Sequence, residues 1–299
     1  MIHNLDELLE TAAHVGERRA LVVSPANPET FDAIREARER LGLHFILGGD
    51  RKIIAAALPD HAGTEIVDRC GIEDCLAAAV ELLGRSAAGI LMKGSVDTAT
   101  LIKAALRPES GLRTGRLLSD IFVFEYASRR DNKLVMITDG GLNIAPDLEA
   151  KLQLIHNAVE VAHALGNGNP KVAMLAATEF VQSNMPATLD AAALSKMSKQ
   201  GQIRGCIVDG PFALDSALVE HAAKEKRLSS EVAGAAEILV CPSIECANAL
   251  AKSTTYLADA RLAHVIVGAR IPILIPSRAD SSDAKLLSLA LGMIMSERG

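Results

Sequence analysis

Short apolar runs alternate with amphipathic segments along most of this chain, and this alternation limits the folds that the chain can adopt. The run "ALVVS" at 20–24 is followed by the helical pattern "PETFDAIREARERLG" and then by "LHFILGG". The run "AGILMKG" at 88–94 leads in the same way into "DTATLIKAALR". Strands that alternate with helices build parallel sheets covered by helices. The sequence therefore predicts an α/β fold.

A predicted antiparallel hairpin interrupts this pattern near the middle of the chain. The runs "IFVFEY" and "KLVMITDGG" flank "ASRRDN" at 127–132, whose composition is typical of a turn. Further apolar runs follow: "KVAMLAATE", "QIRGCIVDG", "EILVCPS" and "AHVIVGA". Two sheets are therefore plausible. We predict a discontinuous first α/β domain formed by 1–128 and 268–299, and a second α/β domain formed by 129–267.

The segment "PDLEAKLQLIHNAVEVAHALG" predicts a helix that begins near Pro146 and ends at Gly166. Its apolar residues recur at helical spacing, which predicts one buried stripe. The expected stripe consists of Leu148, Leu152, Ile155, Val159 and Ala162.

Composition excludes several classes of partner. The 299 residues carry a formal net charge of −6 and no Trp, and only 3% are aromatic, so the chain offers little for stacking bases or binding a phosphate backbone. No run approaches the roughly 18 apolar residues of a membrane span. The N-terminus "MIHNLDELLETAAHVGERR" predicts an acidic amphipathic helix rather than a secretory signal. We expect a cytoplasmic protein that binds neither nucleic acid nor membrane.

The five cysteines, Cys70, Cys75, Cys206, Cys241 and Cys246, have no CxxC spacing. Their apolar neighbours favour reduced, structural thiols, because free Cys is commonly buried.

Polar residues follow several predicted strands, where ligands of α/β sheets bind. Lys93, Gly94 and Ser95 follow one strand, and Lys103 lies on the next helix. The remaining candidates at strand ends are Asp139, Asn143, Asp209, Gly268, Arg270, Ser277 and Arg278.

The stretch "IPSRADSSDAKLL" places Ser277 and Arg278 between an apolar run and a helix. Ser281 or Ser282 is expected to cap that helix, and Asp283 falls in its first turn. The amides of a helix N-terminus attract anions, and an Arg can grip phosphate oxygens in a bidentate way. Capping explains the Ser and Asp residues but not the Arg, so an anion site is the alternative to a surface cap.

Other sites are disfavoured. The chain has no GxGxxG after its first strand and no GxxxxGK[ST], which argues against a Rossmann dinucleotide site and a P-loop. The histidines are scattered, so we expect no metal site. No GxSxG elbow surrounds Ser277.

Several stretches together resemble the phosphate acetyl/butyryl transferases, in the order in which that family has them. They are "LMKGSVDTATLIKAALRPESGLRTG", "ITDGGLNIAPDLEAKLQLI", "KVAMLAATE", "IVDGPFALDSAL" and "VGARIPILIPSRADSSDAKLLSLALG". The phrases "VDGPFALD" and "SRADSSDAKL" are more similar to the phosphate butyryltransferase branch. The resemblance implies two α/β domains with a cleft between them, an architecture related to the isocitrate and isopropylmalate dehydrogenases, and a homodimer.

The implied reaction is reversible transfer of a short acyl group, acetyl to butyryl, between coenzyme A and inorganic phosphate. Acyl-CoA, phosphate and acyl phosphate are then the small-molecule partners. Coenzyme A is a substrate, and no tightly bound cofactor or metal is required.

The resemblance also assigns roles to residues. Arg278 would bind the phosphate, and the hydroxyl of Ser277 would donate to the oxyanion of the tetrahedral intermediate. The family's Arg after the "TADT" stretch matches Lys103, which offers a point charge in place of a planar fork. The family's base falls on Ala284, so Asp283, one residue earlier, is the expected base, with Asp280 earlier still. The expected mechanism is direct attack by the CoA thiolate on the acyl phosphate in a ternary complex.

Two alternatives remain open from the sequence. One is a sensor that binds acyl-CoA or phosphate and has weakened catalysis. The reason to consider it is that Lys103 and Ala284 depart from the family's pattern. The other is a metal-dependent decarboxylating dehydrogenase of the same architecture, which requires an aspartate cluster for Mg²⁺ or Mn²⁺ and an NAD site.

Overall fold

A computed structural model describes residues 1–60, 63–126 and 133–297. The chain divides into two compact units, Met1–Asn4 with Ser119–Leu262, called unit 1, and Leu5–Leu118 with Ala263–Gly299, called unit 2. The domain boundaries expected from the sequence lie between 128 and 129 and between 267 and 268. They describe domains that fold independently, which compact units do not test, so they stay a prediction. The expected turn at 127–132 lies outside the described residues.

The described residues of unit 2 form six strands in the order β3-β2-β1-β4-β11-β10. The pairs from β3 to β11 are parallel, and β10 runs antiparallel to β11. The strands are β1 (Arg19–Val23), β2 (His44–Gly49), β3 (Thr64–Asp68), β4 (Ile90–Lys93), β10 (Leu262–Val267) and β11 (Ile273–Leu274).

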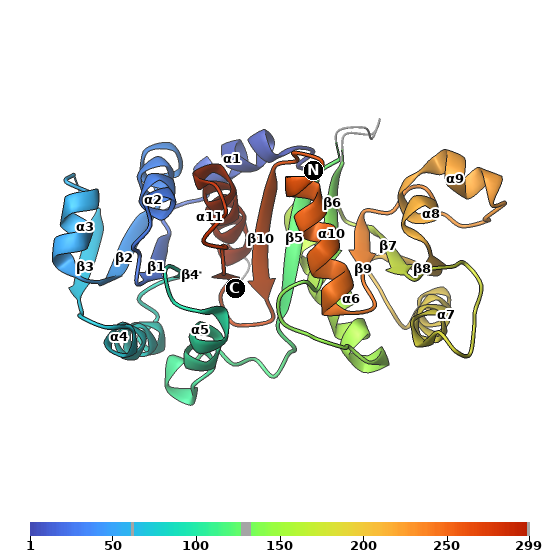
Figure 1. The fold of residues 1–299 in the computed structure, drawn as a ribbon, viewed down its shortest axis with the longest axis horizontal. Coiled ribbons are helices and arrows are strands. Elements are labelled where there is room, and N and C mark those ends of the chain that lie inside the picture. The colour runs from blue at the N-terminus through green and yellow to red at the C-terminus, as the bar shows by residue number, and fades with distance from the viewer. Residues whose placement is uncertain (61–62, 127–132, 298–299) are drawn as a thin grey trace. The chain divides into compact units, whose positions relative to one another are not determined.

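The helices of unit 2 are α1 (Leu5–Ala13), α2 (Pro28–Leu41), α3 (Arg51–Ala57), α4 (Ile72–Gly84), α5 (Thr98–Ala105), the short 3₁₀ helix η1 (Pro108–Ser110) and α11 (Ser282–Ser296). Helices α1, α2 and α11 pack against one another, and α4 packs against α5 and η1. In Figure 1 these two groups lie on opposite sides of β1 and β2. The predicted N-terminal helix is confirmed as α1.

Unit 1 contains five strands in the order β5-β6-β9-β7-β8. They are β5 (Ser119–Glu125), β6 (Leu134–Thr138), β7 (Lys171–Leu175), β8 (Ile207–Phe212) and β9 (Ile238–Val240). The predicted antiparallel hairpin is confirmed, because β5 pairs antiparallel with β6, while the other pairs are parallel.

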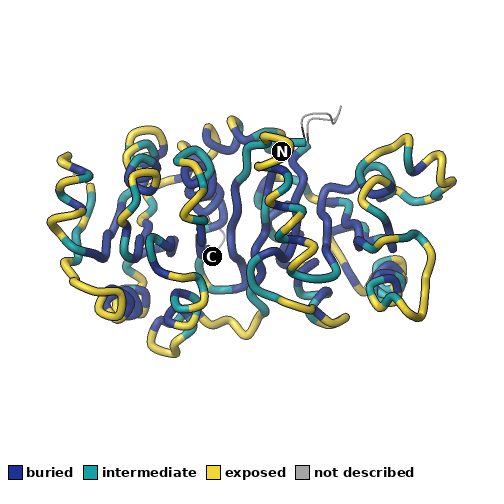
Figure 2. The backbone as a smooth tube through the Cα atoms, in the orientation of Figure 1, coloured by how far each residue is buried: buried dark blue, intermediate teal, exposed yellow. Residues whose placement is uncertain are grey.

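The helices of unit 1 are α6 (Leu148–Ala164), α7 (Pro186–Lys199), α8 (Leu214–Leu218), α9 (Glu220–Glu225) and α10 (Ile244–Tyr256). Figure 2 shows that the strands are mostly buried and that exposed residues gather on the helices and loops. This is the burial expected of sheets covered by helices. Among the described helices, none is both long and apolar enough to cross a membrane.

The predicted stripe of α6 is partly wrong. Leu148 is 38% exposed and Leu152 is only half-buried, whereas Leu154, Ala158 and Val161 are fully buried. The buried face is therefore rotated relative to the expected one. The reason is that the helix is largely apolar around Leu154, and packing rather than spacing selects the face that is covered.

Candidate functional site

The carboxyl ends of two neighbouring parallel strands carry the candidate site in unit 2. Strand β4 pairs with β11 in the register Leu91 to Ile273 and Met92 to Leu274. Lys93 ends β4, and Ser277 and Arg278 follow shortly after β11. Segments distant in the sequence therefore reach the same edge of one sheet, as expected for ligand sites at strand ends.

The loop after β11 is folded around Asp280. The carboxylate Oδ2 of Asp280 accepts from the amide of Ser277 at 2.7 Å, and the amide of Asp280 donates to the carbonyl of Ser277 at 3.2 Å. Ser281 caps α11 through its hydroxyl, which accepts from the amide of Ala284 at 3.2 Å. The predicted cap is confirmed, and the loop holds Ser277 and Arg278 directly before the helix.

Three cationic side chains come together at this edge. Lys93 is buried, Lys285 on the first turns of α11 is 1% exposed, and Arg278 is exposed. Burial lowers the pKa of Lys93, and the charges of Arg278 and Lys285 lower it further. Burial also lowers the pKa of Lys285. Buried ammonium groups that repel one another are costly, and a bound anion would offset that cost.

Carboxylates offset part of this positive charge, since Asp97 opposes the lowering of the pKa of Lys93 and Glu29 opposes that of Lys285. Asp280 opposes the lowering of the pKa of both Lys93 and Lys285, and the ammonium of Lys285 donates to the carbonyl of Asp280. No hydrogen bond of the Lys93 ammonium is found among the described residues. Lys93 is therefore the buried cation best placed to bind a ligand.

Sequence reasoning missed Lys285. It stands in "DAKLLSLALG" as one polar residue among apolar ones, which a surface helix shows routinely. The available signal was its position in the first turns of α11, on the side that the apolar pattern predicts to be buried. A lysine at a buried position requires a polar partner, and that requirement could have marked it.

Gly94 and Ser95 continue the chain beyond β4. The amide of Gly94 donates to the carbonyl of Val23 at 2.9 Å, and that of Ser95 donates to the carbonyl of Ser24 at 2.7 Å. A Cβ on Gly94 would lie 2.4 Å from the carbonyl oxygen of Ser24. Close packing against the end of β1 therefore explains the glycine, while Ser95 is half-buried beside Lys93.

The structure places Gly268 and Arg270 at the other edge of the unit 2 sheet. They lie in the turn between β10 and β11, and β10 is antiparallel to its neighbour, so its carboxyl end meets the amino end of β11. Gly268 has φ +100° and packs against Leu117, while the amide of Arg270 donates to the carbonyl of Leu112 at 3.0 Å. The structure does not bring them to Ser277 and Arg278.

Lys103 lies on the last turn of α5 and is exposed. Helix α5 begins just after the strand end, at the cap Asp97, and runs away from it. Among the described residues no ion pair or hydrogen bond of the Lys103 ammonium is present.

Asp139 and Asn143, in unit 1, form a tightly bonded loop after β6. The two carboxylate oxygens of Asp139 accept from the amides of Gly141, Leu142 and Asn143 at 2.9, 3.2 and 3.2 Å, and from the side-chain amide of Asn143. Burial raises the pKa of Asp139, and the nearby carboxylate of Asp120 raises it further. These contacts assign Asp139 to holding its own loop in shape.

Two glycines in this loop are explained by packing. A Cβ on Gly140 would lie 2.9 Å from the ring of Phe122, and one on Gly141 would lie 2.5 Å from a carboxylate oxygen of Asp120. The side-chain amide of Asn248 donates to the carbonyl of Gly140 at 2.9 Å. The loop is therefore pressed closely against β5 and α10.

The expected strand end at residues 209–211 lies within β8, which continues to Phe212. The pairing with β7 shifts register here, which lets the strand pass Gly210 and Pro211. One carboxylate oxygen of Asp209 accepts from the ammonium of Lys199 at 3.2 Å and from the hydroxyl of Ser195. Burial opposes ionisation of Asp209, but the hydrogen bonds from Ser195 and its neighbours outweigh it and leave its pKa lowered.

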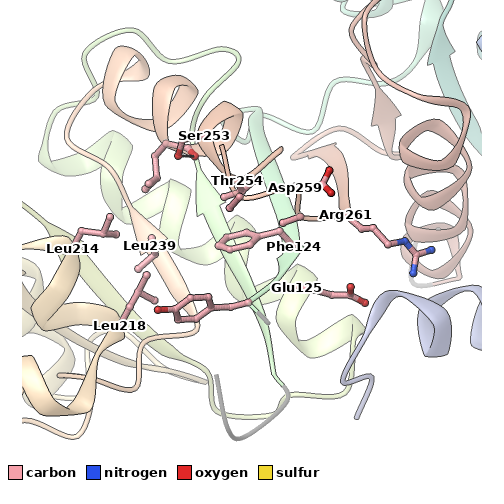
Figure 3. Close-up of a pocket in the computed structure, with 13 residues that line it drawn as sticks. Phe124, Glu125, Leu214, Leu218, Leu239, Ser253, Thr254, Asp259 and Arg261 are labelled. Atoms are coloured by element: carbon pink, nitrogen blue, oxygen red, sulfur yellow. Dashed lines mark hydrogen bonds between the residues drawn. The ribbon is translucent and has the colours of Figure 1, made fainter. Parts of the chain in front are cut away.

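Unit 1 also has an apolar pocket of about 610 Å³. Figure 3 shows Phe124, Leu239 and Leu218 lining it, with Thr254 from α10. Among the described lining residues, Arg261 alone is cationic, and none of the expected site residues takes part. The pocket has the character of an apolar cavity and not of a phosphate site.

The described residues define an α/β protein in which cationic side chains gather at the carboxyl ends of two parallel strands of unit 2. The sequence profile of the phosphate acetyl/butaryl transferases matches residues 60–293. The chain belongs to this family, and it is thereby a phosphate acyltransferase.

Similar proteins cover nearly the whole chain. A "Probable phosphate butyryltransferase" of Bacillus subtilis (strain 168) is 43% identical over 98% of this chain and 98% of its own length. A "Phosphate acetyltransferase" of Thermotoga maritima is 40% identical over 97% of this chain and 99% of its own. The crystal structure of a branched-chain phosphotransacylase from Enterococcus faecalis V583 superposes with a TM-score of 0.84 at 30% identity, covering 93% of this chain and 99% of that one.

Proposed function

We propose that this chain transfers a short acyl group, acetyl to butyryl, reversibly between coenzyme A and inorganic phosphate at the strand-end site of unit 2. The observation that carries the proposal is the meeting of Lys93, Arg278 and Lys285 at the start of α11. Cations and helix amides together favour a multiply charged oxyanion such as phosphate.

Arg278 and Ser277 have different tasks in this proposal. The exposed guanidinium of Arg278 binds the phosphate group of the acyl phosphate, and its permanent charge stabilises the phosphate as it leaves. The hydroxyl of Ser277 donates to the oxygen on which negative charge develops in the tetrahedral intermediate. Lys93, which is buried at the end of β4, supplies a second positive charge for the phosphate.

The carbon–sulfur bond forms by direct attack. The CoA thiolate adds to the carbonyl carbon of the acyl phosphate, and the tetrahedral intermediate then expels phosphate to leave acyl-CoA. Binding both reactants in one complex supplies rate through proximity. A thiol with an ordinary pKa of about 8.5 requires only modest assistance to ionise beside several cations.

The two carboxylates near Ser277 are distinguished by their contacts. Asp280 accepts from the amide of Ser277 and is therefore a positioning residue for the loop. Asp283, half-buried on the first turn of α11, remains our proposed base for the CoA thiol. The side chains of Ser95 and Lys103 are proposed to contact the CoA moiety, which extends beyond the phosphate site.

Four finer expectations also belong to the proposal. They are an isocitrate or isopropylmalate dehydrogenase-like arrangement of two α/β domains with a cleft between them, the absence of a tightly bound cofactor, a homodimer, and a cytoplasmic location. Each rests on the resemblance or on composition. The sensor and the decarboxylating dehydrogenase are not favoured, because the relatives over the full chain are phosphate acyltransferases.

Incubation with acetyl-, propionyl- and butyryl-CoA plus phosphate tests the function. We expect phosphate-dependent release of free CoA thiol with at least one acyl-CoA, and formation of the matching acyl phosphate. Binding of acyl-CoA without thiol release would favour the sensor. Thiol release that does not depend on phosphate would overturn the proposed acceptor.

A further inference from the structure

Ser24 lies at the carboxyl end of β1, the strand beside β4 in the unit 2 sheet (Figure 1). Val23, the last residue of β1, pairs with Lys93, the last residue of β4. The amide of Ser95 donates to the carbonyl of Ser24 at 2.7 Å, so the chain that leaves β4 is bonded directly to this serine. Because neighbouring strands lie about 4.8 Å apart, Ser24 is at the same end of the sheet as the buried Lys93.

The backbone of Ser24 has a conformation that residues with side chains rarely adopt. Its φ is +56°, in the left-handed region, where a Cβ costs free energy and glycine is free of that cost. Three other described residues with side chains share this region, namely Ser86, Arg227 and Asp259. Each of them follows the end of a helix, α4, α9 or α10, where a left-handed residue commonly terminates the helix. Among the described residues, Ser24 is the one such case that follows a strand.

The hydrogen bonds of the backbone explain the left-handed conformation but not the serine. The amide of Ser24 donates to the carbonyl of Gly48 in β2 at 2.7 Å, while its carbonyl accepts from Ser95, just beyond β4. Ser24 therefore links the chain to both neighbours of β1. Glycine would make both hydrogen bonds without the steric cost. The side chain of Ser24 is thus the part that the fold does not require, and a strained residue at a strand end leads to a hypothesis of function.

The hydroxyl of Ser24 is available to a ligand. Ser24 is half-buried, and in the part of the chain that the structure describes its hydroxyl makes no hydrogen bond. Lys93, which is 6% exposed, also has no hydrogen bond of its ammonium among those residues. Both groups are donors, and a phosphate group offers several acceptor oxygens.

We propose that Ser24 is a further phosphate-binding residue of the strand-end site, and that its hydroxyl donates to an oxygen of the phosphate group that Arg278 and Lys93 bind. This inference rests on the proposed acyl transfer, because it assigns another donor to the same substrate. A hydroxyl suits this position, since it recognises a phosphate oxygen without adding a third charge to two cations that already repel one another. The bound phosphate would reach from the loop after β11 across the end of β4 to the end of β1.

Binding of inorganic phosphate to the full chain tests this inference without relying on turnover. Isothermal titration calorimetry measures the Kd for phosphate in the wild type, Ser24→Ala and Ser24→Gly. We expect both variants to bind phosphate at least about tenfold more weakly, the loss typical of a hydrogen bond to a charged group. Ser24→Gly also removes the steric cost, so its thermal unfolding midpoint should equal or exceed that of the wild type.

Ser86→Ala is the matched control. Ser86 has φ +54° but precedes β4, at the amino ends of the strands, where Gly89 donates to the carbonyl of Arg19. Its substitution should leave the Kd for phosphate unchanged. Wild-type affinity in Ser24→Ala would overturn the proposal. Weak binding in Ser24→Ala together with wild-type affinity in Ser24→Gly would also overturn it, because the backbone and not the hydroxyl would then be responsible.

Steady-state kinetics separates this inference from the proposed function. In the reaction of acyl-CoA with phosphate, Ser24→Ala should raise the KM for phosphate by the factor seen in the Kd, with kcat changed by less than about threefold. If the wild type transfers the acyl group but Ser24→Ala has an unchanged KM for phosphate, only the assignment of Ser24 fails. If the wild type releases no CoA thiol while the serine variants lose phosphate affinity, acyl transfer fails and Ser24 remains a phosphate-binding residue.

Discussion

The guanidinium of Arg278 and the ammonium of Lys93 lie near enough at the ends of β11 and β4 for the charge of one to affect the other. Burial lowers the pKa of Lys93 most, and Arg278 is the next cause. Two like charges are held together in the absence of a ligand, at a cost that the rest of unit 2 must support. An oxyanion between them would turn this repulsion into attraction.

Arg278→Ala is expected to lower kcat/KM for acyl phosphate by about 100-fold, since a charge-assisted contact to the leaving phosphate is lost. Arg278→Lys should recover only part of the activity, because an ammonium replaces a bidentate fork. Arg35→Ala, which removes an exposed arginine paired with Asp32, is the matched control and should retain activity. Steady-state kinetics checks all three variants. Wild-type turnover in Arg278→Ala would place the anion site elsewhere.

Substitution of Arg270 tests which end of the unit 2 strands carries the chemistry. Its place after an apolar run grouped it with Ser277 in the sequence, whereas the antiparallel direction of β10 puts it at the opposite edge. Arg270→Ala should therefore change kcat/KM by less than about tenfold, the factor that corresponds to about 1.4 kcal/mol. A loss as large as that of Arg278→Ala, in a variant whose thermal unfolding is unchanged, would contradict this placement.

Lys93→Met is expected to raise stability while it weakens phosphate binding. The charged form of Lys93 is disfavoured in the folded state, so its removal should increase the unfolding free energy near neutral pH by about 1 kcal/mol. Urea unfolding measures this change, and Lys52→Met, at an exposed lysine of α3, is the control that should change little. A marked destabilisation by Lys93→Met would mean that Lys93 makes a favourable native contact.

The affinity for phosphate should fall as pH rises. This fall should begin at a lower pH than the titration of an ordinary lysine would produce. The pKa values of Lys93 and Lys285 are both lowered from 10.5, so these groups lose their positive charge first as pH rises. The KM for phosphate should therefore begin to rise at a pH below 10.5, the ordinary lysine value. Lys93→Arg does not titrate in this range and should shift the rise to higher pH. An identical profile in Lys93→Arg would assign the rise to another group.

The same lowered pKa values fix the sign of the pH effect on stability. Between the folded pKa of Lys93 and 10.5, the unfolded chain binds more protons than the folded one. Stability contributed by this group therefore rises with pH through that window. Asp280 works against the shift, since its negative charge favours the protonated lysine. Unfolding free energies of the wild type and Lys93→Met, measured across that window, should converge as pH rises.

Asp139→Asn is expected to destabilise unit 1 by about 2–3 kcal/mol. One carboxylate oxygen of Asp139 accepts from both the backbone amide and the side-chain amide of Asn143. In Asp139→Asn, an NH₂ group in place of that oxygen would be a donor opposite two donors, and those hydrogen bonds would be lost. Asp147→Asn is the matched control, because the exposed cap of α6 accepts Asn as readily as Asp. Urea unfolding compares the two. Equal stability of both variants would show that the loop contacts of Asp139 contribute little.

The local pattern of the sequence was sufficient to predict the main elements and the cap of α11. The alternation of apolar runs with helices predicted the α/β fold, the hairpin of β5 and β6 was recognised from its turn composition, and Ser281 was expected at the cap of α11. These features depend on residues close together in the chain, and capping and periodicity are encoded at that range.

The composition of the site depended on contacts between distant segments. Lys285 lies near Lys93 because α11 packs with this lysine facing inward. Gly268 and Arg270 lie away from Ser277 and Arg278 because β10 runs antiparallel to β11. Strand direction and helix rotation are set by how sheets and helices bury their apolar surfaces together, which no local spacing reports. The sequence by itself determined the elements and the family, and the tertiary structure decided which charged side chains lie together.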